Sequence, residues 1–157
     1  MTPSKDFLTA GCAIFTVEPS NHFNEVMRQL GRENDDHYTY RIEKAEFEEG
    51  RTMFFVQALT GPDNTSDYTY VGVLNTDQGS IRLTRKSAFQ ETATRVQIAQ
   101  RVLQRIFADQ GEAIERAGWK VHHAGRCGRC GRTLTTPDSC ESGIGPECRK
   151  ILSSERS

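Results

Sequence analysis

Residues 37–74 decide the expected fold and read HYTYRIEKAEFEEGRTMFFVQALTGPDNTSDYTYVGVL. Three runs in this stretch are rich in β-branched and aromatic residues that alternate with polar ones, as is typical of strands: 37–47, 51–59 and 68–74. Glu48-Glu49-Gly50 is short enough to close a hairpin, and Gly61-Pro62-Asp63-Asn64 is a strong turn signal. The stretch therefore predicts an antiparallel meander.

Weaker patterns flank this meander on both sides. Alternation predicts a first strand at 8–17 and a further strand at 80–84. Between a Ser20 N-cap and a Gly31 C-cap, apolar residues recur at the spacing of a short amphipathic helix: Phe23, Val26, Met27 and Leu30. We expect this helix to pack beside the sheet.

From about residue 91 to residue 117 the apolar period changes to that of a helix. One face is lined by Val96, Ala99, Leu103, Ile106 and Phe107. Gly111 is expected to break or bend this long helix. The arginines of the segment lie mainly on the opposite, solvent side.

Composition and charge exclude several classes of protein. Apolar residues make up 36% and charged residues 26% of the chain, a balance that argues against a disordered or membrane protein. No apolar run approaches the ~20 residues that a bilayer span needs, and the N-terminus does not resemble a signal peptide. We therefore expect a cytoplasmic protein. The net charge of −1 combines −5 over residues 1–92 (9 basic, 14 acidic) with +4 over 93–157 (11 basic, 7 acidic).

Four of the five cysteines cluster near the C-terminus, a pattern that favours a metal site in a cytosolic chain: Cys127, Cys130, Cys140 and Cys148. Two thiolates three residues apart can bind one tetrahedral zinc ion where glycines allow a tight turn, as Gly128 and Gly131 do. Pro146 would begin a short helix that carries Cys148 in its first turn. The fourth ligand is either Cys140 or the imidazole of His123. We expect one structural zinc ion per chain.

The same segment resembles the C-terminal signature of an uncharacterised family that is common in bacteriophage and prophage genomes. The resemblance rests on H-x-G-R-C-G-R-C-G-R-x-L-T-x-P-x-S over 123–139, followed by G-I-G-P-x-C over 143–148. A looser similarity covers strand-like motifs within 37–90. In the family, the position of Cys140 is usually aliphatic, which favours His123 as the fourth ligand. The resemblance implies a phage origin, hence the cytoplasm of a host cell, and implies no established activity.

These observations predict an α+β fold: a small antiparallel sheet with a short N-terminal helix and one long helix, ending in a finger like a zinc ribbon or treble clef. The expected domains are an α+β domain over 1–118, with the long helix at about 91–117, and a zinc-binding finger with a short C-terminal tail over 119–157.

The expected function is non-enzymatic, with no catalytic residues. His122 and His123 could act as general bases in a metal-dependent nuclease, but no histidine follows them, and a zinc ion with four protein ligands has no open position for water. The first hypothesis is a phage accessory protein that binds a host protein, such as a component of a host defence system. The alternative is a nucleic-acid-binding module whose basic zinc knuckle contacts phosphates through Arg126, Arg129, Arg132, Arg149 and Lys150. The oligomeric state stays open, and no membrane partner is expected.

Overall fold

The structure is a computed structural model of the 157-residue chain. It describes residues 3–19, 37–62, 66–108, 111–116, 118–123, 127–129 and 143–156. The helix predicted from Phe23 to Leu30 lies outside these residues. In the described ranges, no helix is both long and apolar enough to cross a membrane.

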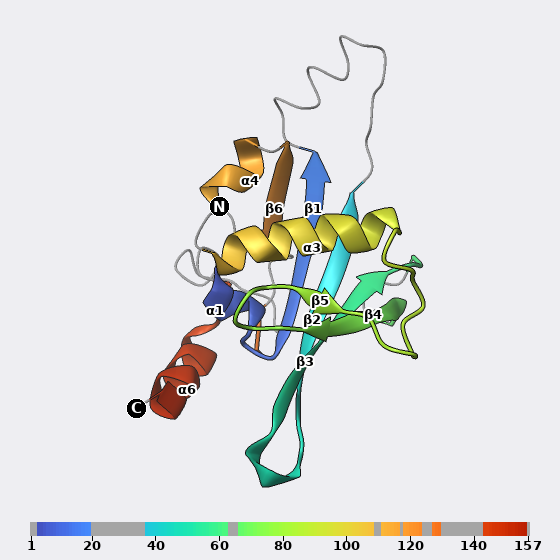
Figure 1. Ribbon diagram of the computed structural model, residues 1–157. Coiled ribbons are helices and arrows are strands. Elements are labelled where there is room, and N and C mark those ends of the chain that lie inside the picture. Colours follow the sequence, from blue (N-terminus) through green and yellow to red (C-terminus); the bar gives the residue numbers. More distant parts are fainter. Residues whose placement is uncertain are drawn as a thin grey trace.

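A six-stranded antiparallel sheet dominates the protein (Figure 1). Its strands are β1 (Cys12–Pro19), β2 (Tyr38–Glu46), β3 (Thr52–Leu59), β4 (Tyr68–Leu74), β5 (Ile81–Arg82) and β6 (Trp119–His123). The strand order is β5-β4-β3-β2-β1-β6, so the first five strands form a meander and the last strand adds to its β1 edge. The meander predicted from residues 37–74 is confirmed, because local turns join neighbouring strands.

The helices are short and lie around the sheet: α1 (Lys5–Leu8), the 3₁₀ turn η1 (Glu48–Gly50), α3 (Thr94–Phe107), α4 (Glu112–Arg116) and α6 (Pro146–Arg156). Figure 1 shows α3 crossing one face of the sheet. α4 lies against β6. α6 follows the cysteine segment at the C-terminal end of the chain.

The predicted fold class is wrong. The sheet is the main element of the protein rather than a small one, and the one long helix expected at 91–117 is two short helices, α3 and α4. Residues 119–123 are a strand of the same sheet, because Phe15, Val17 and Pro19 of β1 pair with His123, Val121 and Trp119. The zinc-ribbon or treble-clef ending is not shown by the described part of the chain, in which no zinc site is present.

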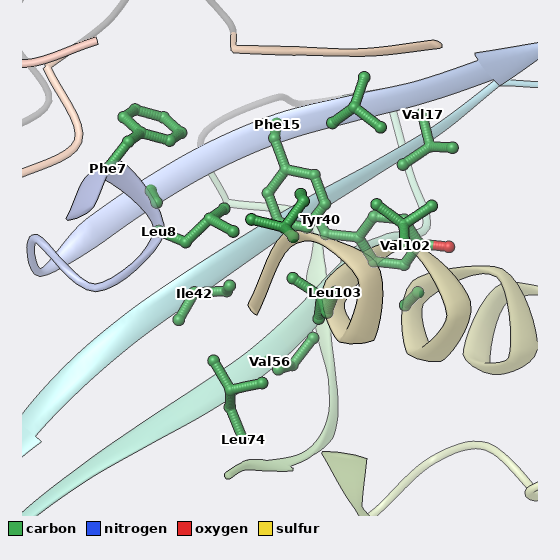
Figure 2. Packing of buried hydrophobic residues seen from close by; sticks show 14 of the residues in the cluster. Phe7, Leu8, Phe15, Val17, Tyr40, Ile42, Val56, Leu74, Val102 and Leu103 are labelled. Atoms are coloured by element: carbon green, nitrogen blue, oxygen red, sulfur yellow. The ribbon is translucent and has the colours of Figure 1, made fainter. Parts of the chain in front are cut away.

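The core lies between α3 and the face of the sheet that α3 covers. Alternate residues of β1 point into it, and Phe15 stacks on Tyr40 with ring centroids 5.4 Å apart. Figure 2 shows Val102 and Leu103 of α3 among the inward side chains of the first three strands. The largest fully buried side chains include Phe7, Leu8, Phe15, Tyr40, Ile42, Leu103 and Ile114. The sequence alternation therefore reflects one apolar and one polar face.

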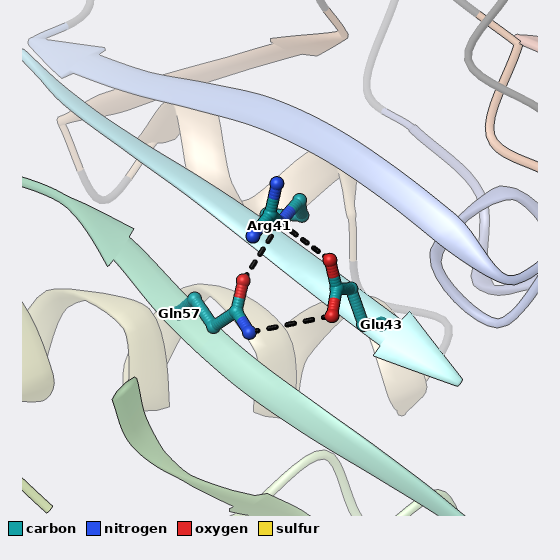
Figure 3. A network of polar contacts seen from close by, with 3 residues as sticks. All are labelled: Arg41, Glu43 and Gln57. Carbon is teal, nitrogen blue, oxygen red and sulfur yellow. Dashed lines mark hydrogen bonds and ion pairs between the residues drawn. The ribbon is translucent and has the colours of Figure 1, made fainter. Parts of the chain in front are cut away.

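The opposite face of the sheet carries a polar network (Figure 3). Arg41 Nε donates a 2.7 Å hydrogen bond to Gln57 Oε1 and lies 3.0 Å from Glu43 Oε1, while Gln57 Nε2 donates to Glu43 Oε2 at 3.4 Å. The Arg41 guanidinium also lies 4.2 Å from the centre of the Tyr68 ring. These cross-strand contacts join β2, β3 and β4, and help to fix their register.

Candidate metal centre

Two glycine-containing turns meet between β6 and α6, at residues 127–129 and 143–145. The N–H of Gly128 donates a 2.7 Å hydrogen bond to the carbonyl oxygen of Gly143. The carbonyl oxygen of Gly128 in turn accepts a 2.6 Å bond from the N–H of Cys12, at the start of β1. The turns are therefore joined to one another and to the sheet.

Phe7 of α1 packs directly beneath both turns. Ser4 caps α1, because its hydroxyl accepts a hydrogen bond from the Phe7 N–H at 3.2 Å. A Cβ atom on Gly128 would lie 2.6 Å from Phe7 Cδ2, and one on Gly143 would lie 2.5 Å from the same atom. Gly143 also has a φ of +77°, which favours glycine. Only glycine lets both turns approach this ring so closely.

The sulfur of Cys127 is surrounded by backbone donors. It accepts hydrogen bonds from the N–H of Arg129 at 3.4 Å and from the N–H of Gly145 at 3.3 Å. Cys127 is only 1% exposed, so water does not replace these donors. N–H groups directed at sulfur stabilise the negative charge of a thiolate, the form of cysteine that binds metals.

Cys148 lies in the first turn of α6 and is also buried. Arg129 Nη1 lies 3.7 Å from its sulfur, within hydrogen-bond distance. The positive end of the helix dipole adds to this favourable field. Arg129 thus contacts the sulfurs of both cysteines, one through its backbone and one through its guanidinium.

The remaining predicted ligands divide into two groups. Cys130 and Cys140 lie outside the described residues. His123 ends β6 and faces the inner side of the sheet, with its ring centroid 5.6 Å from that of Phe7. No group of three or more His, Cys, Asp or Glu residues is placed to hold a metal ion in the parts of the chain that the structure describes. The ligand set therefore stays a prediction.

The predicted basic surface divides in a similar way. Arg126 and Arg132 lie outside the described residues. Arg149 and Lys150 are exposed on α6, whereas the half-buried Arg129 bonds to Cys148. Arg129 is therefore turned toward the protein interior rather than toward a partner.

His122, the other candidate base, lies on the opposite face of β6 from His123. Its Nε2 is 3.5 Å from Glu18 Oε1, and both side chains are well exposed to solvent. This position separates His122 from the two cysteines.

Sequence reasoning missed the supports of the site, Phe7 and Gly145. Residue 8 was expected to begin a strand, but Lys5–Leu8 is a helix and β1 begins at Cys12. Ser4 before an apolar pair was the available signal for that helix, and it is weak. Gly145 could be recognised only as part of a glycine-rich turn.

The fold and the site define an antiparallel β-sheet protein with a buried pair of cysteines in its C-terminal segment. Residues 121–153, which run from β6 through both glycine turns into α6, match a family of unknown function, DUF6011. This match fits the expectation of an uncharacterised family. No curated protein and no solved structure matches the chain.

Proposed function

We propose that this protein is a zinc-binding accessory protein of bacteriophage or prophage origin, which binds a host protein and has no catalytic turnover of its own. The observation that carries the metal part of the proposal is the surroundings of Cys127. Its buried sulfur receives two backbone N–H groups, from Arg129 and Gly145. A neutral thiol gains little from such donors, whereas a metal-bound thiolate gains much.

Cys127 and Cys148 would hold the ion together with Cys130 and either Cys140 or His123. Bound zinc would supply a cross-link between the two turns, a structural role rather than a chemical one. Four protein ligands would leave no position for a reactive water, which supports a protein without turnover. The chain itself supplies the donors, the glycine turns and the packing of Phe7 that hold the cysteines in place.

Single substitutions test this ligand set. Cys127→Ser and Cys148→Ser should each lower the zinc content of freshly reduced protein strongly. Cys12→Ser is the matched control, because Cys12 lies in β1 outside the cysteine signature and should leave the zinc content unchanged. Cys140→Ser and His123→Ala, made separately, should identify the fourth ligand. Full zinc content in both Cys127→Ser and Cys148→Ser would contradict the proposal.

The partner part of the proposal rests on charge. Residues 1–92 carry a net charge of −5, which favours oriented docking on a basic surface of a host protein, such as a component of a defence system. The contact of Arg129 with Cys148 supports a protein partner over nucleic acid, because it engages one of the knuckle arginines inside the protein. The phage origin rests on the resemblance of 123–148 to the phage family.

Competition between DNA and protein tests the partner. We expect affinity capture from a nuclease-treated lysate of a host bacterium to retain a protein, and to retain it also with Arg126→Glu and Arg132→Glu. Those two substitutions spare Arg129 and its contact with Cys148. Purified protein should bind duplex DNA weakly at physiological salt. Tight DNA binding that the two substitutions abolish would instead establish the nucleic-acid-binding module.

A further inference from the structure

Two large apolar side chains stand out on the surface of the described residues. Phe47 is 45% exposed and Ile151 is 41% exposed, and the described part of the chain has no other exposed large hydrophobic residue. They differ in the charges around them. Glutamates flank Phe47, whereas Arg149 and Lys150 directly precede Ile151. The two positions are thus complementary in charge and both apolar at the centre.

Phe47 lies at the tip of a ribbon that extends beyond the rest of the sheet. The pairing of β1 with β2 ends at Glu43, and that of β4 with β3 ends at Phe55, whereas β2 and β3 continue to pair as far as Glu46 and Thr52. A 2.7 Å hydrogen bond from the Phe47 N–H to the Arg51 carbonyl oxygen closes the tip. Figure 1 shows this hairpin projecting from the body of the protein.

The exposed groups of this tip, which we call the acidic tip, are Glu46, Phe47 and Glu48. The side chain of Glu46 is 73% exposed although it pairs with Lys44 at 3.4 Å. The Arg51 guanidinium lies 5.5 Å from the centre of the Phe47 ring and so covers only part of it. An exposed aromatic ring between carboxylates fits an apolar spot that is bordered by cations.

The first half of α6 presents a spot of that kind, which we call the basic helix surface: Arg149, Lys150 and Ile151, all exposed. Figure 1 shows α6 and the acidic tip at the same end of the molecule. Two copies related by a two-fold axis at this end could therefore bring each acidic tip against the basic helix surface of the other copy. Such an isologous arrangement is closed and makes two identical contacts.

We propose that the protein forms a two-fold symmetric dimer in which the acidic tip of each chain docks on the basic helix surface of its partner. Because the contacts are small and at the rim of the molecule, the dimer is weak, and because charges contribute, it dissociates as salt increases. This dimerisation is separate from the host partner and from zinc binding.

Sedimentation velocity of the full chain, over a range of concentrations at low salt, tests the proposal. We expect a concentration-dependent dimer, and we expect Phe47→Ala or Ile151→Ala to raise its dissociation constant at least about tenfold. Both side chains are exposed, so thermal unfolding should change little. Glu91→Lys with Asp77→Lys is the matched control, since both residues are exposed, lie outside the two surfaces and change the net charge equally.

A charge exchange makes the test specific. Glu46→Lys with Glu48→Lys places cations at the tip, and Arg149→Glu with Lys150→Glu places carboxylates on the helix. Each double variant alone should be monomeric, but an equimolar mixture should form a heterodimer, because both of its contacts pair opposite charges. A wild-type chain that stays monomeric, a mixture that does not associate, a dimer unaffected by Phe47→Ala and Ile151→Ala, or open-ended polymers would each overturn the proposal.

Discussion

Replacing Phe7 by alanine should loosen the proposed metal site from beneath. Phe7 is fully buried, packs against Gly128 and Gly143, and lies beside the ring of His123. Removing a buried phenylalanine side chain costs about 3–5 kcal/mol. That loss is a large part of the ~5–15 kcal/mol by which a domain of this size is stable.

A stability loss alone does not show that Phe7 supports the metal site, so the experiment needs a matched core substitution. Phe15→Ala is suitable, because Phe15 is equally buried but stacks on Tyr40 beneath α3. Both variants should unfold at lower denaturant concentration. Only Phe7→Ala should also weaken zinc binding, by about 10–100-fold, as expected when a group that positions metal ligands is lost.

Thermal unfolding followed by circular dichroism measures the first effect, and competition with a colorimetric zinc chelator measures the second. If Phe7→Ala is too unstable to study, Phe7→Leu keeps most of the packing and should show a smaller change in the same direction. Equal zinc affinities for Phe7→Ala and Phe15→Ala would refute the view that α1 holds the two turns in place.

Two further predictions concern the sheet and the helix above it. Gly79→Ala should lower the free energy of unfolding by about 1–3 kcal/mol, since Gly79 has a φ of +76° and a Cβ there would collide with the Leu103 carbonyl oxygen; Gly50→Ala, with a φ of +73° and open space around it, should lose less in the same urea titration. Tyr40→Phe should lose about 1 kcal/mol near neutral pH, because the Tyr40 hydroxyl donates a 2.7 Å hydrogen bond to the Arg95 carbonyl oxygen. Burial, reinforced by Tyr38, raises the pKa of Tyr40 well above its ordinary value, so the unfolded chain releases this proton first as the pH rises above about 10. Urea titrations should therefore show wild-type stability falling above that pH, and falling less steeply in Tyr40→Phe; equal slopes would contradict this assignment.

The strands of the meander could be predicted because their signals are local. β4 has the predicted bounds of 68–74, and β3 begins one residue later than predicted. Alternating residues and the turn at 61–64 lie within a few positions of one another, so nothing distant is needed to recognise them.

The extent of the sheet could not be predicted in this way. β6 contains five residues, too few to establish a period, and it becomes a strand by pairing with β1 more than a hundred positions earlier. The sequence between them also reads as one long helix, in which Gly111 marks the actual division between α3 and α4. Tertiary pairing therefore decides the part of the fold class that local patterns predicted wrongly.

The candidate site shows the same contrast. Cysteine spacing brought Cys127 and Cys148 to attention, and the structure places both sulfurs against Arg129. The glycines indicated a close approach of the backbone, but only the structure shows that Phe7 is the group approached. Contacts between α1 and a turn some 120 residues later leave no periodic trace in the sequence.

X-ray absorption at the zinc edge, on protein purified without chelator, tests the central claim most directly, since it reports the metal and its ligand atoms together. We predict about one zinc ion per chain with three or four sulfur ligands at about 2.3 Å, and one imidazole nitrogen where only three sulfurs are found. A zinc environment of oxygen and nitrogen alone, or less than about half an equivalent of zinc in reduced protein, would contradict a site built by these cysteines.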